Sequence, residues 1–187
     1  MADPRTIRRR ATAFFWAATA TYVACVVWAA LTLPDVVATH FDGAGRADDH
    51  STRGEAIALW SGLGVFVLGG GWLLARFPPQ SREWVNMREE WKDHWLEDAD
   101  RRRDYQRIAG GALLELTAAT GILLAVLVVV TSHATTTGSG VGPALWASLV
   151  AYGACTVWRC VVLVRDLRPP EDPTDAEGAG SSSPQPH

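Results

Sequence analysis

Four long apolar stretches alternate with polar segments along this chain. They cover residues 11–33, 56–75, 108–131 and 143–164. Each has about the 20 residues that an α-helix needs to cross ~30 Å of hydrocarbon. Inside a stretch, charged residues do not recur at every turn, as they do on the exposed face of a soluble helix. The pattern predicts an all-α integral membrane protein with four transmembrane helices.

The polar segments complete the predicted organisation. We expect a basic N-terminus, a loop after span one, a longer segment after span two, a short loop after span three and a tail: residues 1–10, 34–55, 76–107, 132–142 and 165–187. Beyond Leu167 the tail is acidic, rich in Pro, Gly and Ser, and without apolar anchors. We therefore expect it to be disordered.

The distribution of Lys and Arg predicts the orientation in the membrane. Of the 17 basic residues, fourteen lie in the N-terminus, the 76–107 segment and the tail, and two lie in the loop after span one. Cytoplasmic segments carry an excess of Lys and Arg, so both termini and residues 76–107 are expected in the cytoplasm. The two loops then face outward, and the plasma membrane is the expected location.

Composition narrows the classes of function. Hydrophobic residues make up 48% of the chain, and the formal net charge is only -3. No basic cluster is interleaved with aromatic residues, so nucleic acid is not an expected partner. No nucleophile stands beside a base, so we expect no enzyme, no catalytic residue and no cofactor. The lipid bilayer is the expected partner, and a homo-oligomer stays open.

Helix-breaking residues divide the loop after span one. Pro34 ends the first apolar stretch, because proline disrupts a continuing helix. Gly43 and Gly45 suit tight turns with positive φ. His40 and Phe41 lie between these breakers.

Five residues of this loop match a family pattern in order and spacing: Pro34, His40, Phe41, Gly45 and Asp48. They resemble the membrane family called domain of unknown function 1648, and the resemblance covers residues 10–130. A second similar element lies in the 76–107 segment and consists of Asn86, Lys92, Trp95, Leu96 and Arg101–Arg103. The family includes the immunity protein against a sporulation-delaying toxin, which doubles as a signalling partner. That role does not transfer on resemblance alone.

The polar residues of the same loop have two interpretations. In one, the loop folds over the outer ends of the spans, with His40 hydrogen-bonded and Phe41 at the membrane interface. In the other, imidazole and carboxylate groups converge on a divalent metal, for which both are suitable ligands. The candidate ligands are His40, Asp42, Asp48, Asp49 and His50. None lies in a recognised metal-binding spacing, so we predict no metal site.

An amphipathic helix is predicted between spans two and three. Within residues 82–107, four apolar side chains follow at offsets of 0, 3, 7 and 11: Trp84, Met87, Trp91 and Trp95. They share a narrow helix face, and the rest of the helix is charged. This pattern is typical of a helix that lies in the membrane interface. The same face also suits packing on the inner ends of the spans, or docking of a cytoplasmic partner.

Two charged residues lie inside the predicted spans, where charge is costly. Glu115 and Arg159 both lie about 10 Å from the cytoplasmic boundary, at about 1.5 Å per residue. Spans three and four are joined by a short loop, so we expect antiparallel neighbours. We predict a Glu115–Arg159 ion pair in the bundle. The alternatives are an Arg159 that reaches the headgroups alone and a Glu115 that is protonated or hydrated.

Span two is rich in glycine, which lets helix backbones approach closely. The glycines are Gly62, Gly64, Gly69, Gly70 and Gly71. Close packing is the expected role of the last three, and a hinge is the alternative.

Two functions fit these observations. We expect a non-enzymatic sensor, immunity or accessory factor that contacts partners through its outward loop and its cytoplasmic helix. The alternative is a small oligomeric transporter or permease subunit that uses Glu115 and Arg159. Four spans form a thin scaffold for a transport path unless copies associate, and no inverted repeat is visible.

Overall fold

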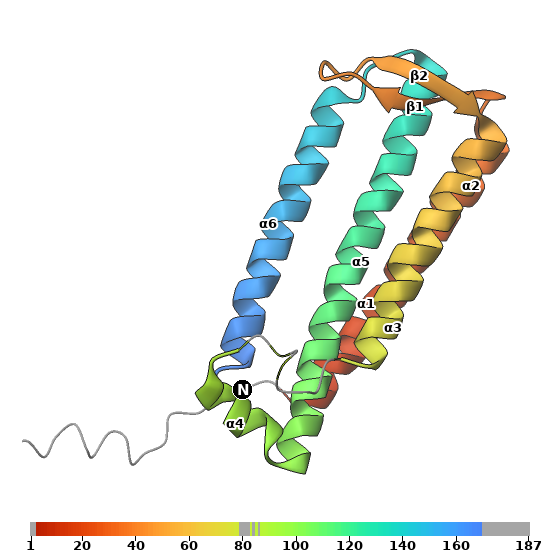
Figure 1. Cartoon of the computed structure of the whole chain (residues 1–187). Coiled ribbons are helices and arrows are strands. Elements are labelled where there is room, and N and C mark those ends of the chain that lie inside the picture. The colour runs from red at the N-terminus through yellow and green to blue at the C-terminus, as the bar shows by residue number, and fades with distance from the viewer. Residues whose placement is uncertain (1–2, 79–82, 84, 86, 170–187) are drawn as a thin grey trace, which may run out of the picture.

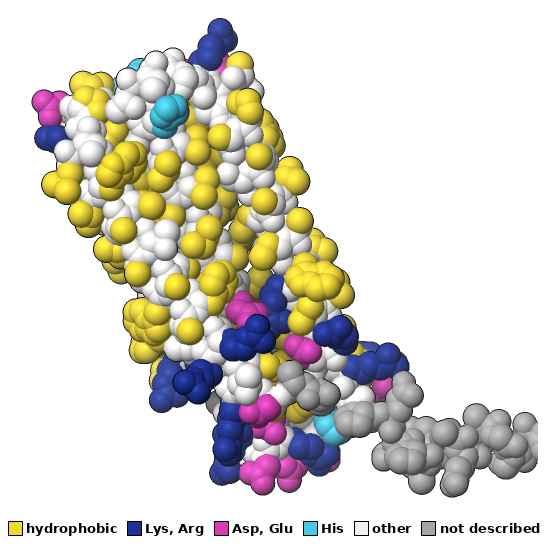
Figure 2. Space-filling model, turned by 180° about the vertical axis from the view of Figure 1, so that it is seen from behind, with side chains coloured by type: hydrophobic (Ala, Val, Ile, Leu, Met, Phe, Trp, Pro, Cys, Tyr) yellow, Lys and Arg dark blue, Asp and Glu magenta, His cyan; other side chains and the backbone are white. Residues whose placement is uncertain are grey.

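The computed structural model describes residues 3–78, 83, 85 and 87–169. Four of its helices are long and apolar enough to cross a membrane: Pro4–Thr32, Arg53–Arg76, Ala99–Thr137 and Gly142–Asp166. Large apolar side chains are exposed along the sides of the bundle, whereas charged side chains gather near its ends (Figure 2). Lipid covers a surface of this kind, so the chain is a multi-pass membrane protein, as predicted.

Helix α5 (Ala99–Thr137) forms the centre of the bundle (Figure 1). Helix α1 (Pro4–Thr32) packs closely along it, and α6 (Gly142–Asp166) packs along it on another side. A third neighbour is one continuous rod made of α2, η1 and α3, which cover Arg53–Gly64, Val65–Gly69 and Gly70–Arg76. The described chain begins and ends at the same end of the bundle.

Small side chains explain why α1 and α5 lie so close together. The alanines at the contact are fully buried: Ala11, Ala18 and Ala29 on α1, and Ala118 and Ala125 on α5. Lipid tails are as apolar as leucine, so membrane helices associate through such close van der Waals packing. By contrast, none of the side chains of α6, all of which the structure describes, is fully buried.

The α2–α3 rod contains one π-helical turn, η1, and two of its glycines receive side chains from neighbouring helices. The Tyr22 hydroxyl donates a 2.5 Å hydrogen bond to the Trp60 carbonyl, and its ring lies where a Cβ on Gly64 would stand. At Gly71, the Thr117 side chain of α5 occupies the place where a Cβ would stand. Around Gly69 and Gly70 a Cβ would meet nothing within 4 Å. Close packing is thus the role of Gly71 but not of Gly69 and Gly70.

A β-hairpin replaces the loop expected over residues 34–55. Strand β1 (Val36–Phe41) pairs antiparallel with β2 (Ala47–Thr52), with irregular register around His40. The all-α prediction is therefore wrong at this end of the bundle, which we call the hairpin end. Gly45 has φ 79° as expected of a turn glycine, but Gly43 does not adopt positive φ. The β-branched residues of β1 favour a strand, whereas β2 is polar after Ala47 and gives no alternating pattern.

The four spanning helices are longer than their apolar stretches. Helix α1 begins at Pro4 because the Asp3 side chain accepts a hydrogen bond from the Arg5 amide. Helix α5 runs on to Thr137, where Gly138 at φ 67° ends it. Serine and threonine hydroxyls in its last turns bond to carbonyls one turn back, so polar residues remain helical there.

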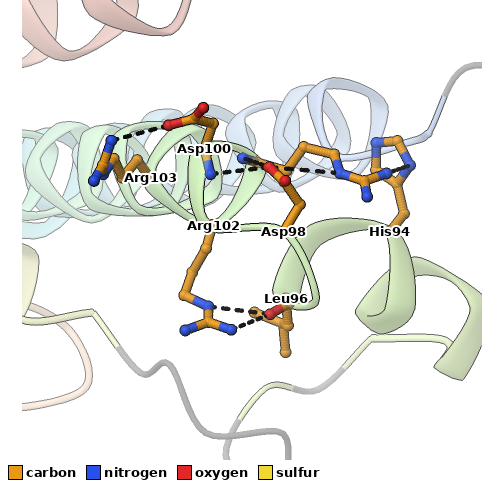
Figure 3. Close-up of polar contacts among 7 residues, drawn as sticks. His94, Leu96, Asp98, Asp100, Arg102 and Arg103 are labelled. Atoms are coloured by element: carbon orange, nitrogen blue, oxygen red, sulfur yellow. Dashed lines mark hydrogen bonds and ion pairs between the residues drawn. The ribbon is translucent and has the colours of Figure 1, made fainter.

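The predicted amphipathic helix over 82–107 is also corrected. Helix α4 covers only Glu89–Leu96, Met87 precedes it, and Trp84 lies outside the described residues. The chain turns after α4 because Asp98 starts a new helix, with its side chain accepting the amide protons of Asp100 and Arg101 (Figure 3). The Arg102 guanidinium donates to the last carbonyl of α4, at Leu96, and fixes the angle between the helices.

Adjacent glycines of the rod allow a matched test of this packing. The Gly71→Ala variant is expected to unfold at a lower temperature than Gly70→Ala, because only its new methyl group collides with Thr117. Overpacking of this kind costs about 1–3 kcal/mol. Thermal unfolding of both variants in detergent measures the difference, and equal midpoints would contradict the packing described.

Candidate functional site

The turn of the β-hairpin is built around one carboxylate. The Asp42 side chain accepts hydrogen bonds from the backbone amides of Ala44 and Arg46, each at 2.9 Å, and pairs with the Arg46 guanidinium. The Arg46 amide above all holds the pKa of Asp42 below its ordinary value of 3.8. This network fixes the turn and commits Asp42 to a structural role.

His40 and Asp48 meet across the two strands. The His40 Nδ1 lies 2.5 Å from Asp48 Oδ1, and both side chains are largely exposed. Among the described residues, no group of three His, Cys, Asp or Glu side chains is placed to hold a metal ion. Of the candidate ligands, the structure brings these two together, whereas Asp42 is held in the turn and His50 lines a cavity described below.

The remaining motif residues place the hairpin over the bundle. Pro34 directly follows Leu33, the residue that ends α1, and Phe41 pairs with Ala47 at the last step of the ladder. Gly45 lies against the backbone of the α5–α6 turn, and its carbonyl accepts a 3.0 Å hydrogen bond from the Val141 amide. A Cβ at Gly45 would lie 2.7 Å from the Gly142 nitrogen, so no larger residue fits this contact.

Two further contacts lie near the strands: one joins β1 to α5, and the other joins the start of α2 to the end of α1. The Ala38 amide donates to the Thr135 hydroxyl of α5 at 3.2 Å. The Arg53 guanidinium donates to the carbonyl of Leu33, at the end of α1, and pairs with Asp35. The Ala38–Thr135 bond holds the hairpin on α5, and Val37 of β1 is completely buried.

A polar cavity of about 460 Å³ lies between the hairpin and the end of α5. Its hairpin side is lined by Val36, Ala38, Arg46, Ala47 and His50, and its α5 side by Ala134, Thr135, Gly138, Ser139 and Gly140. The size falls in the range of ordinary ligand pockets. The lining carries an imidazole, a guanidinium and two hydroxyl groups; the guanidinium pairs with Asp42, and the hydroxyls of Thr135 and Ser139 bond to Thr131 and Thr137. We call this cavity the hairpin pocket.

A larger cavity, of about 560 Å³, is an apolar groove between α1 and the α2–α3 rod. Two of its few polar groups are occupied, since the Thr19 hydroxyl bonds to the Phe15 carbonyl and the Tyr22 hydroxyl to the Trp60 carbonyl. It lies on the sides of the bundle, where lipid chains fill such grooves. The hairpin pocket is therefore the better candidate site.

The two intramembrane charges lie side by side between α5 and α6. The Arg159 Nε contacts the Glu115 carboxylate, and Nη1 lies 3.9 Å from Asp166 Oδ2. The contact is ionic: neither nitrogen makes a regular hydrogen bond to a residue that the structure describes. About 12% of the Arg159 side chain is exposed, so it does not extend alone to the surface. One and a half turns further along α5, Thr120 bonds to Tyr152 of α6 at 3.0 Å.

The tryptophan face of α4 packs on the ends of the spans. The Trp95 indole is buried and donates a 2.8 Å hydrogen bond to the Leu167 carbonyl, just after α6. Leu96, Tyr105 and Ile108 surround it, while Met87 and Trp91 are partly buried at the edge of the same cluster. Of the three interpretations of this face, the structure shows packing against the spans. Because Trp95 is buried in this packing, it is not available to a docking partner.

Of the residues that line the pocket, sequence reasoning singled out only His50, as a weak metal candidate, and it missed the wall formed by the end of α5. Thr135 and Ser139 lie in a segment taken as a short connecting loop, where nothing distinguishes them from other polar residues. The sequence signal for this wall is the glycine-rich run from Gly138 to Gly142, which allows the hairpin turn to approach closely. Comparison of the chain with protein-family models, curated proteins and solved structures gave no match.

The lowered pKa of Asp42 predicts the pH response of the hairpin. Folding favours the charged carboxylate, so its contribution is complete above pH 3.8 and is lost as pH falls through the lower, folded pKa. An NMR titration of the Arg46 amide in the folded protein should therefore show a midpoint below 3.8. A midpoint at or above that value would contradict the hydrogen-bonded turn.

A double-mutant cycle tests the intramembrane pair. Glu115→Gln and Arg159→Gln should each lower the thermal stability, because each removes the nearest counter-charge of a partly buried group, at a cost of at most about 3–5 kcal/mol. The double variant should recover much of that loss. Thermal unfolding and oligomeric state in detergent are the measurements. Stable single variants with no coupling would exclude a structural pair.

Proposed function

We propose that this chain is a non-enzymatic sensor, immunity or accessory protein of the plasma membrane that recognises a ligand at its hairpin end. The excess of Lys and Arg at the other end supports a cytoplasmic location for both termini and an outward-facing hairpin. The proposed ligand is small and polar, on the scale of a few residues of peptide.

The observation that carries this proposal is the hairpin pocket. Its walls are fixed to one another by the Gly45–Val141 and Ala38–Thr135 hydrogen bonds, so the cavity is formed before any ligand arrives. In a preformed site, no part of the binding free energy is lost to the ordering of loops. Its polar groups converge from separate elements, whereas the opposite end of the bundle uses Trp95 for internal packing.

The proposal includes membership of the family called domain of unknown function 1648. The support is that four of its five motif residues have joint structural tasks: Pro34 and Gly45 set the ends and turn of the hairpin, and His40 meets Asp48 across it. Contact with a partner protein at the same end follows from this proposal, and a toxin-like peptide is one such partner.

A peptide-display screen against the full-length protein in lipid nanodiscs tests the proposed function. Short peptides that bind should lose at least ten-fold in affinity on Ser139→Trp, which fills the pocket. They should retain affinity on Asp49→Asn, an exposed change on the same hairpin outside the cavity. Binders that are indifferent to Ser139→Trp would refute recognition in this pocket. Labelling of Ser139→Cys by an impermeant maleimide in intact cells checks that this end faces outward.

A small oligomeric transporter or permease subunit is the second candidate, favoured by the charges of Glu115, Arg159 and Asp166 between α5 and α6. Because α6 packs along α5 and buries none of its side chains fully, a transport path would need a second copy to enclose it. In liposomes, ion flux abolished by Glu115→Gln with assembly intact would favour this function. Absence of flux in the unmodified protein would exclude it.

A further inference from the structure

Arginines from three helices line one pocket at the end of the bundle opposite the hairpin. The pocket has a volume of about 210 Å³. Its lining residues are Arg8 of α1, Ala75 and Arg76 of α3, Pro78, and Arg103, Gln106 and Arg107 of α5. We call it the arginine pocket. The residues come from positions far apart in the sequence, so the cluster is a product of the fold.

The charge in this pocket is only partly compensated. Arg103 pairs with Asp100 at 2.9 Å, and Arg107 pairs with Asp104 at 2.7 Å. Within the part of the chain that the structure describes, no carboxylate pairs with Arg8 or Arg76. Two positive charges therefore remain, which attract an anion.

The Arg8 side chain is held in place by the packing of α1 on α5. It crosses α5 over Gly110, and its Nη1 donates a 3.1 Å hydrogen bond to the Ala75 carbonyl near the end of α3. A Cβ at Gly110 would lie 2.7 Å from that carbonyl oxygen and closer still to Nη1. Only glycine leaves room for the crossing. The guanidinium is thus fixed beside the pocket, and among the described residues Nη2 and Nε have no hydrogen-bond partner, so they can face a ligand.

The depth of the pocket points to its ligand. Arg76 is the last residue of α3, and Trp72, Leu73 and Leu74 on the preceding turn are exposed along the lipid-facing side. The pocket therefore lies where hydrocarbon gives way to headgroups. Guanidinium groups match the oxygen geometry of phosphate groups, and basic pockets between spans bind anionic headgroups.

We propose that the arginine pocket binds a phosphate-bearing anion, and that its source is the phosphodiester headgroup of an anionic lipid. The site lies at the opposite end from the hairpin pocket and does not depend on the function proposed there. Bound in this way, the phosphate group would be a counterion shared by the arginines of α1, α3 and α5.

Thermal unfolding of the full-length protein in neutral detergent tests the proposal with three added probes: phosphatidylglycerol, phosphatidylcholine and inorganic phosphate. Phosphatidylglycerol should raise the midpoint and phosphatidylcholine should not. Arg76→Gln should at least halve the shift, because no carboxylate among the described residues pairs with Arg76, whose guanidinium lies over the neighbouring Phe77 ring. Arg9→Gln is the matched control, since it removes one exposed charge from α1 outside the pocket.

Each outcome decides the question. A shift with phosphatidylglycerol that Arg76→Gln reduces and Arg9→Gln retains supports the lipid headgroup. If only inorganic phosphate raises the midpoint, and Arg76→Gln reduces that shift while Arg9→Gln retains it, the phosphate site is supported and its ligand is a soluble anion. An equal shift in both variants, or none, overturns the proposal. Native mass spectrometry gives an independent readout, because Arg76→Gln should retain fewer phosphatidylglycerol molecules than Arg9→Gln.

Discussion

The close approach of α1 and α5 is the constraint on which the rest of the structure depends. It depends on small residues buried along the contact, from Gly110 and Gly111 at one end to Ala118 and Ala125 further along. Once α1 lies there, Tyr22 reaches the rod at Gly64, and Arg8 reaches the end of α3. The three contacts place the spans in one register, so a larger side chain at a single buried position would disturb both ends of the molecule.

Helix α6 is attached differently from the other spans. Polar contacts hold it in place. The Val141 N–H donates to the Gly45 carbonyl of the hairpin turn, and the Leu167 carbonyl accepts from Trp95. Between these ends, Tyr152 bonds to Thr120 and Arg159 pairs with Glu115. Polar contacts are directional, and in hydrocarbon no water competes for them, so they set the rotation of a helix that buries none of its side chains fully. The indole of Trp95 thereby links α4 to the last span.

The sequence predicts the spans well and their surroundings less well. Twenty apolar residues in a row leave few alternatives to a membrane helix, and depth counted from the span ends is enough to suggest that Glu115 and Arg159 are close. Strand β2 could not be found in this way, because its six residues are nearly all polar and its partner supplies the strand preference. The walls of the hairpin pocket could not be found from the sequence either, because Thr135 contacts Ala38 only through tertiary packing. Trp95 fits a helical face in the sequence, but its burial depends on the end of α6, which no local pattern reports.

The position of the hairpin pocket along α5 governs how a ligand would arrive. Thr135 comes only four residues after Thr131, where the apolar stretch ends, which is about 6 Å of helix. The headgroup layer on each side of a bilayer has a similar thickness, so the pocket opens inside that layer and not above it. A molecule that partitions onto the membrane surface is concentrated at this height and searches in two dimensions. Amphiphilic ligands thus have a kinetic advantage over strictly water-soluble ones of equal affinity.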